Sequence, residues 1–176
     1  DVRIIWGGNR TIHLIRQAEL PPRAIEMAFA DRHSLSLIQA DEVNERESID
    51  DLVEGFYTDT YYSDQNACSS PRIVIWLGDK EAVAKAKERF WNALHEKVVE
   101  QYDLKPVHII DKWDMFCQIA AKSQDVHLES GNDGWVMRIQ VDKLTADLMD
   151  YKLGGGYFYE YNATNLEELY PILGKS

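Results

Sequence analysis

Several features that often reveal the class of a protein are scarce in this sequence. Its 176 residues include two cysteines, Cys68 and Cys117, too few for a disulfide framework. Lys and Arg number 19 against 30 Asp and Glu, and the net charge of −11 argues against binding to nucleic acid. No apolar run approaches the roughly 18 residues of a membrane-spanning helix. No secretion signal is visible, so we expect a cytoplasmic protein without a membrane span.

Metal ligands are equally sparse. The five histidines are His13, His33, His95, His108 and His127. No two of them have metal-ligand spacing and no Cys/His cluster exists, so a zinc site is not expected. His33 directly precedes an expected strand, at the kind of edge where sites are built. It is therefore the best candidate for a base that would ionise a thiol.

The pattern of apolar residues predicts an α/β fold. Short apolar or alternating runs are typical of strands, and they cover residues 2–6, 24–30, 34–40, 72–77, 107–110, 126–130, 135–141 and 157–161. Helical spacing or helix-start signals cover residues 9–18, the second half of 41–64, 79–103, 111–121, 142–150 and 165–173. Because strands and helices alternate, we expect three layers, with a largely parallel sheet between helices.

A polar loop around Cys68 is the most informative stretch. In SDQNACSSPR, residues 63–72, the thiol has small and polar neighbours and precedes a strand-like run. A nucleophilic thiolate needs such a reachable setting, and Gln65, Asn66 and backbone N–H groups could donate to an oxyanion. The alternative is that Cys68 is a small buried hydrophobe, and both readings stay open. For Cys117, inside an apolar helix pattern, packing in the core is expected.

Two glycine-rich turns complete the candidate sites. Gly7 and Gly8 follow the first strand and would permit close approach of a phosphate, although the full GxGxxG pattern is missing, so a simple tight turn is the alternative. The GGG at residues 154–156 has no P-loop pattern and is expected to be a flexible turn.

The order of these pieces resembles that of a known family. IIWGG, a helix, FADRHSLSLI, and QNACSSPR leading into a strand are similar to the long-chain acyl-CoA reductases of the bacterial bioluminescence type, a branch of the aldehyde dehydrogenase superfamily. The resemblance implies an aldehyde-dehydrogenase-like catalytic domain at 31–176 and a remnant of the nucleotide-binding domain at 1–30. It implies that Cys68, in a loop partly matching Gly-Gln-x-Cys, is the nucleophile, and that Gly7 and Gly8 approach NADPH.

The sequence departs from the superfamily at two glutamates. The glutamate base is not matched, since Phe29 falls nearest to its place, and His33 in the same stretch could replace it. The glutamate that positions the nicotinamide ribose has Lys152 or Leu153 in its place. The first departure argues against hydrolysis to an acid and suits an enzyme that works in the reductive direction.

The resemblance implies a concrete reaction. Cys68 would attack an acyl-CoA, with Asn66 helping to hold the oxyanion, and the acyl-cysteine thioester would be reduced by NADPH to a fatty aldehyde. Most of the cofactor domain has no counterpart here, so the chain alone is expected to be inactive as a reductase. An acyl-activating partner protein or a homo-oligomer would be compatible with the family. The alternatives are a cysteine acyltransferase or thioesterase, and a non-catalytic interaction domain.

Overall fold

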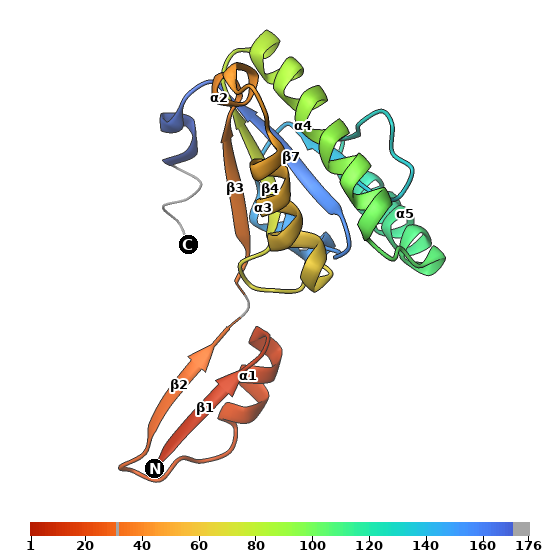
Figure 1. Ribbon diagram of the computed structural model, residues 1–176. Helices are drawn as coiled ribbons and strands as arrows, with labels where there is room; N and C mark the ends of the chain where they lie inside the picture. Colours follow the sequence, from red (N-terminus) through yellow and green to blue (C-terminus); the bar gives the residue numbers. More distant parts are fainter. Residues whose placement is uncertain (31, 171–176) are drawn as a thin grey trace. The chain divides into compact units, whose positions relative to one another are not determined.

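A computed structural model describes residues 1–30 and 32–170 of the chain (Figure 1). The chain divides into two compact units, Asp1–His33 and Ser34–Ser176. In the part of the chain that is described, no helix is both long and apolar enough to cross a membrane.

The first unit is a strand–helix–strand segment. β1 (Val2–Trp6) and β2 (Ile25–Phe29) pair in parallel, from Val2 opposite Ile25 to Trp6 opposite Phe29. Helix α1 (Asn9–Arg16) lies between them in sequence, as parallel pairing requires a crossover. Both strands and the helix confirm the sequence-based expectation.

One face of this small sheet is apolar and turned to solvent. Side chains alternate along a strand, so every second residue of β1 lies on this face beside its paired residue on β2. The apolar residues of this face are between 49% and 77% exposed: Val2, Ile4, Trp6, Ile25 and Met27. Parallel sheets are normally covered on both faces. The first unit therefore presents an apolar surface larger than its own helix covers.

The second unit is built on one mixed sheet. Its order is β3 (Ser34–Gln39), β4 (Pro71–Leu77), β7 (Tyr157–Ala163), β6 (Met137–Val141) and β5 (Val126–Leu128). Neighbouring strands are parallel except for β5, which pairs antiparallel with β6. The largely parallel sheet and the β5–β6 pairing agree with the sequence pattern.

Helices cover both faces of this sheet, which makes three layers (Figure 1). The helices on the first face are α2 (Ala40–Glu45), α3 (Asp50–Thr60) and α4 (Lys80–Gln101). Val74, Trp76 and Phe158 point toward them. On the other face, Met137, Ile139 and Tyr159 pack with α5 (Pro106–Ala120) and the 3₁₀ helix η2 (Ala146–Tyr151).

Helix α4 follows the predicted pattern closely. The carboxylate of Asp79 caps it by accepting hydrogen bonds from the backbone N–H groups of Glu81 and Ala82, both at 2.9 Å. The face expected to be internal carries Ala86, Phe90, Leu94 and Val98, all fully buried, and the half-buried Ala82.

A buried carboxylate lies between the sheet and α4. Glu160 on β7 is 0% exposed, and its Oε2 accepts hydrogen bonds from the indole N–H of Trp76 at 2.7 Å and of Trp91 at 2.9 Å. A charge in this position needs such donors, because burial without them is costly.

Three expectations for the chain between residues 40 and 121 are wrong. Residues 107–110 are not a strand but the first turn of α5, because Pro106 at the first helical position favours a helix start. Helix α2 was not expected. On α5 the buried residues are Lys112 and Ile119, whereas Cys117 is exposed and Trp113 is 40% exposed. Cys117 therefore does not pack in the core.

The last two helical segments agree in part with the expectation from the sequence. The helix expected at 142–150 is the 3₁₀ helix η2, which begins at Ala146. The helix expected at 165–173 is represented by the 3₁₀ helix η3 (Leu166–Leu169), capped by the Asn165 side chain. Residues 171–173 of that expectation lie outside the described residues.

Candidate active site

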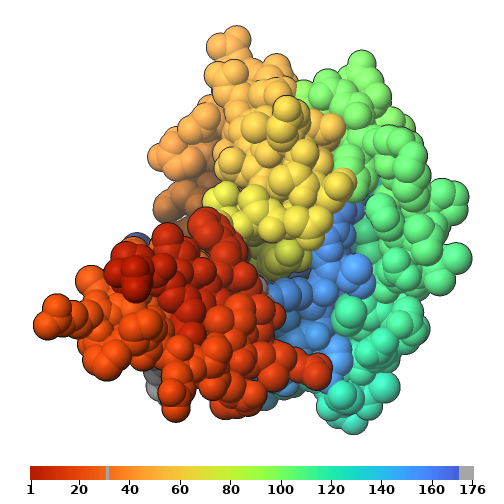
Figure 2. All heavy atoms as spheres, turned by 90° about the horizontal axis from the view of Figure 1, so that it is seen from below, coloured from red at the N-terminus to blue at the C-terminus, as the bar shows by residue number. Residues whose placement is uncertain are grey.

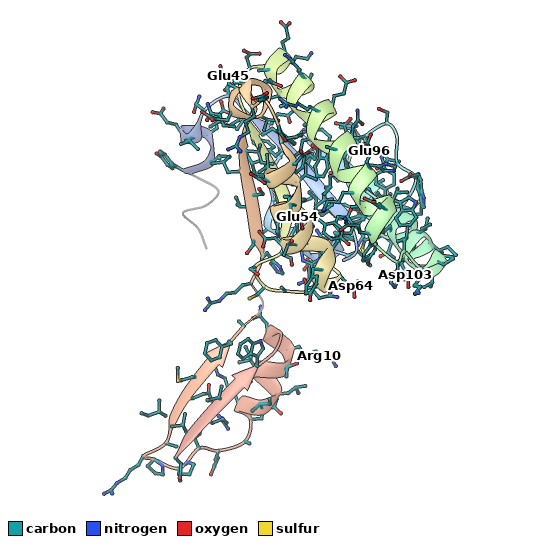
Figure 3. The ribbon with its side chains drawn as sticks, viewed as in Figure 1. Arg10, Glu45, Glu54, Asp64, Glu96 and Asp103 are labelled. Carbon is teal, nitrogen blue, oxygen red and sulfur yellow. The ribbon has the colours of Figure 1, made fainter. Side chains whose placement is uncertain are left out.

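Cys68 is exposed on the loop between the 3₁₀ helix η1 (Tyr61–Ser63) and β4. The loop begins at Asp64, which Figure 3 labels at the end of the segment that follows α3. Asp64 and Gln65 both have positive φ, 51° and 58°, so the chain turns sharply here. The free thiol therefore stands on an irregular segment at the start of a buried strand.

Gln65 anchors the loop to the sheet. It is 0% exposed, and its amide makes four hydrogen bonds. Nε2 donates to the carbonyls of Pro71 at 2.9 Å and Tyr157 at 3.2 Å. Oε1 accepts from the backbone N–H groups of Gly156 at 3.1 Å and Tyr157 at 3.2 Å. The expectation that this amide donates to an oxyanion is wrong, because both of its ends are used in the interior.

The other end of the loop is fastened by Ser70. Its hydroxyl donates to the carbonyl of Asp59 at 2.5 Å, and its backbone N–H donates to the carbonyl of Ala67 at 3.0 Å. Arg72 donates from Nη2 to the carbonyl of Gln65 at 2.6 Å. Buried anchors on both sides thus hold a short exposed segment that contains Cys68.

Around Cys68 itself, the contacts involve the backbone. The hydroxyl of Ser34, at the start of β3, donates to the Cys68 carbonyl at 2.8 Å. The Asn66 N–H donates to the carbonyl of Ser63 at 2.9 Å, and the Asn66 side chain is on the exposed surface. Neither bond uses the N–H of Cys68, so neither competes with an oxyanion for that donor.

The GGG turn before β7 packs directly against this loop. The Gly155 N–H donates to the carbonyl of Asp64 at 3.0 Å. A Cβ on Gly154 would lie 2.2 Å from the same oxygen, so only glycine allows this approach. In Figure 2 the yellow atoms of α3 and the following segment lie against the blue atoms that lead into β7. The turn expected to be flexible is thus part of the support of the cysteine loop.

A pocket of about 280 Å³ opens beside the Cys68 loop. Its lining residues are Asp64, Asn66, Tyr102, His108, Asp111 and Leu153–Gly155. The Tyr102 hydroxyl donates to Asp64 Oδ1 at 2.8 Å. Burial, and then this hydrogen bond to a carboxylate, raise the pKa of Tyr102. Tyr102 is therefore a neutral hydrogen-bond donor in this pocket at neutral pH.

Lys112 lies beneath the same region. It is 0% exposed, and Nζ donates to the carbonyls of Gly134, at 2.6 Å, and Gly155. Burial lowers the pKa of Lys112 to about 8, while the negative charge of Asp133 opposes that shift. A lysine in this position is unusual, since lysine is almost never fully buried unless paired.

The lowered pKa of Lys112 predicts a pH dependence of stability. Between about 8 and the ordinary value of 10.5, the unfolded chain binds more protons than the folded protein, so stability rises with pH. The contribution of Lys112 to the free energy of unfolding is expected to rise by on the order of 1 kcal/mol per pH unit from about pH 8 to about pH 10. Burial raises the pKa of several tyrosines, which act in the opposite direction near pH 10, so urea unfolding is compared between the wild type and Lys112→Met, and the wild type should show the steeper upward slope. An equal slope in both proteins would contradict it.

The remaining predicted site residues lie in the first unit. Gly7 and Gly8 form the turn between β1 and α1, and Gly7 has a φ of +154°. A Cβ on Gly7 would lie 3.1 Å from Thr11 Cγ2, because the side chain of Thr11 already packs beside this glycine. His33 is exposed and is the last residue of the first unit, directly before β3. Two other histidines, His13 on α1 and His127 on β5, are also exposed.

Two residues of this region were missed as structural determinants. Gln65 stands out in the sequence only as one polar residue among several in the loop. Lys112 interrupts the apolar pattern of α5, so the sequence pattern does not show which face of this helix is buried. A signal existed for Lys112, because it lies three residues after Ile109 and four before Phe116, which is helical spacing. In the described residues, no group of three or more His, Cys, Asp or Glu side chains could hold a metal ion.

Solved aldehyde dehydrogenases share this fold. The NAD-dependent aldehyde dehydrogenase of Sinorhizobium meliloti matches with a TM-score of 0.63 and 12% identity, over 97% of this chain and 36% of its own. Staphylococcus aureus AldH in its substrate-bound state matches with a TM-score of 0.58 and 12% identity, over 99% of this chain and 39% of its own. A methylmalonate-semialdehyde dehydrogenase described as putative, from S. meliloti and complexed with NAD, matches with a TM-score of 0.60 and 14% identity, over 95% and 37%.

These comparisons place the chain in a fold and in a family. The chain spans between 36% and 39% of the length of these three enzymes. No curated protein sequence matches the chain. The sequence of residues 1–135 matches the family of acyl-CoA reductases described as LuxC. That match covers more than half of the chain, which therefore belongs to the acyl-CoA reductase (LuxC) family.

Proposed function

We propose that this chain is the cysteine-bearing catalytic part of an NADPH-dependent acyl-CoA reductase. The observation that carries the proposal is the exposed thiol of Cys68 on a loop whose neighbours Gln65 and Ser70 are buried and hydrogen-bonded. A nucleophile needs both access and a fixed position, and this arrangement gives both. Membership of the acyl-CoA reductase family supports an acyl thioester as the substrate.

The first half-reaction needs only groups of this chain. The Cys68 thiolate attacks the carbonyl carbon of an acyl-CoA, and a C–S bond forms while the carbonyl oxygen becomes an oxyanion. The N–H of Cys68 and the Asn66 side chain are the donors that we assign to that oxyanion. When the oxyanion collapses, the bond to CoA breaks and CoA leaves as a thiolate. The product is an acyl thioester on Cys68.

The second half-reaction needs a hydride. A nicotinamide cofactor, which we propose to be NADPH, supplies this hydride to the acyl carbon when it is bound. The same donors at Cys68 and Asn66 hold the oxyanion that forms again. Collapse of this oxyanion breaks the C–S bond, frees the aldehyde and restores the Cys68 thiolate. Cysteine suits both steps, because a thiolate is a good nucleophile and a good leaving group. His33 is proposed as the base that removes the proton of the Cys68 thiol.

The first unit fits a cofactor loop. A strand, the Gly7–Gly8 turn and a helix follow one another, and the two glycines of the turn have no side chains of their own. We propose that residues 1–30 belong to a nucleotide-binding domain and that 31–176 are the catalytic domain. The apolar face of β1 and β2 supports this, since such a face is normally covered. Reduction is then expected only when a complete nucleotide-binding domain is present.

The setting of the protein follows from the same reasoning. Both cysteines are free thiols on the surface, which is compatible with a reducing compartment, and we propose the cytoplasm. The net charge of −11 disfavours nucleic acid as a partner. An acyl-activating protein or a second copy of the chain would be compatible partners.

Acylation of Cys68 tests the proposal. Incubation with palmitoyl-CoA is expected to add one palmitoyl group to the wild-type chain and none to Cys68→Ala. Intact mass measures both. Cys117→Ala is the matched control, because Cys117 is also exposed but lies on α5, and it should be acylated as the wild type is.

Two other outcomes would lead elsewhere. Acylation that is followed by release of the free acid, and by no aldehyde when NADPH and a complete nucleotide-binding domain are supplied, would favour a thioesterase or acyltransferase. If neither the chain alone nor the chain supplied with a complete nucleotide-binding domain is acylated, Cys68 is a residue of a non-catalytic domain and the proposal is overturned.

A further inference from the structure

Lys112 and the cysteine loop form hydrogen bonds with the two polar ends of one peptide group. The carbonyl of Gly155 and the N–H of Gly156 belong to the same planar peptide unit. Lys112 Nζ donates to that carbonyl, and Gln65 Oε1 accepts from that N–H at 3.1 Å. The amine of α5 and the side chain that anchors the Cys68 loop are therefore connected through one peptide.

The connection continues on both sides of this peptide. The Gly155 N–H donates to the carbonyl of Asp64 at 3.0 Å, one residue before Gln65. Lys112 also donates to the carbonyl of Gly134 at 2.6 Å, in the segment before β6. A Cβ on Gly134 would lie 2.8 Å from the side chain of Ile109, so this segment is pressed against α5. One buried amine thus holds two backbone segments that are far apart in sequence.

Packing alone does not account for a lysine here. A methionine or leucine would fill the space beneath the turn without the cost of burying an amine. Gly155 and Gly156 both have positive φ, 62° and 91°, a conformation that residues with side chains rarely adopt. Because glycine has no side chain to restrict the backbone, the peptide between these two residues can rotate unless a hydrogen bond holds it. A donor on α5 prevents that rotation, and rotation would break the hydrogen bond to Gln65.

We propose that Lys112 is a positioning residue for Cys68: by fixing the Gly155–Gly156 peptide, it holds Gln65 and so the loop that carries the thiol. This inference rests on the proposed function in so far as Cys68 is the nucleophile. Lys112 does not touch the reacting atoms. Its effect is on the alignment of the loop, where a displacement of about 1 Å can lower a rate by about a hundredfold.

The matched control is a second buried lysine. Lys87 on α4 has a side chain that is 11% exposed, and its Nζ donates to Gln140 Oε1 at 2.7 Å and lies 3.3 Å from Glu160 Oε2. It lies on the other face of the sheet from α5. Lys87→Met therefore removes a buried amine of the same kind without touching the glycine turn.

The test combines acylation with hydrogen exchange. Lys112→Met is expected to slow acylation of Cys68 by palmitoyl-CoA by roughly tenfold to a hundredfold, whereas Lys87→Met leaves it within about threefold. In Lys112→Met, amide exchange is expected to rise in segments 63–71 and 153–157 relative to α4. In Lys87→Met no such local rise is expected. Lys112→Leu, which also lacks an N–H donor, serves if Lys112→Met does not fold.

The outcomes separate this inference from the proposed function. If the wild type is not acylated but exchange rises locally in Lys112→Met, the reaction is wrong and the positioning of the loop by Lys112 stands. If the wild type is acylated and Lys112→Met matches Lys87→Met in both rate and exchange, the inference is overturned. Equal exchange in the two variants overturns it whatever the acylation result.

Discussion

Gly156→Ala is expected to lower the free energy of unfolding by about 4 kcal/mol, or to prevent folding. A Cβ at this position would lie 2.2 Å from the Tyr61 hydroxyl oxygen and 2.5 Å from the carbonyl oxygen of Trp135. These two atoms are hydrogen-bonded to each other at 2.8 Å, so neither can move away alone. Overpacking of this kind costs about 1–3 kcal/mol. The φ of +91° adds a further cost of about 1–2 kcal/mol for a side chain.

Gly55→Ala is the matched control for this prediction. Gly55 lies inside α3, and no atom lies within 4 Å of the Cβ that alanine would add. Alanine is the better helix former by about 1 kcal/mol, so this variant is expected to be more stable than the wild type. Urea unfolding followed by circular dichroism measures both variants. A loss below about 1 kcal/mol for Gly156→Ala would mean that the turn before β7 is not tightly packed.

Glu160→Ala is expected to lower the free energy of unfolding by about 3–5 kcal/mol, because it leaves buried partners without their acceptor. The carboxylate accepts from two indoles and also faces two cations. Lys87 Nζ lies 3.3 Å from Oε2, and Arg138 Nε lies 3.6 Å from Oε1. Without Glu160, both cations and the N–H groups of Trp76 and Trp91 lose their common partner. Urea unfolding measures the loss, and tryptophan fluorescence reports the change around the two indoles.

Two further variants make this prediction specific. Glu160→Gln keeps an acceptor for the indoles but removes the charge, so its loss should be smaller than that of Glu160→Ala. Glu129→Ala removes another carboxylate near the same cations, at 3.7 Å from Lys87 and from Arg138, but its side chain is 30% exposed. A partly exposed ion pair contributes at most about 1 kcal/mol. Equal losses for Glu129→Ala and Glu160→Ala would contradict the role given to burial.

The architecture was predictable where one physical signal dominated. Along α4, apolar residues recur at steps of four from Ala82 to Val98, and this face is the one that packs on the sheet. Along β4, the continuous apolar run marks a strand covered on both faces, as in a parallel sheet. The resemblance that rested on IIWGG and QNACSSPR indicated the family that the match over residues 1–135 shows.

The supports of the candidate site were not predictable in the same way. Gln65 and Lys112 are polar residues in the interior, and their partners are backbone groups far along the chain, at Tyr157 and Gly155. Sequence patterns place polar residues outside unless their partners are known. The expectation for Cys117 was wrong for the opposite reason. It is a small apolar residue, but its position on α5 lies on the exposed side of the helix. The roles of Cys68, Asn66, His33, Gly7 and Gly8 stay predictions.

The apolar face of β1 and β2 has a consequence for how unfolding of this chain is measured. A small sheet with one bare face has little core, while the second unit has extensive clusters on both faces of its sheet. We therefore expect the two units to unfold in separate transitions, so that one midpoint would not describe the chain. Of the five tryptophans, Trp6 lies in the first unit and the other four lie in the second, where Trp76 and Trp91 are buried. Early changes in the emission of Trp6 would report the melting of the first unit, ahead of the second.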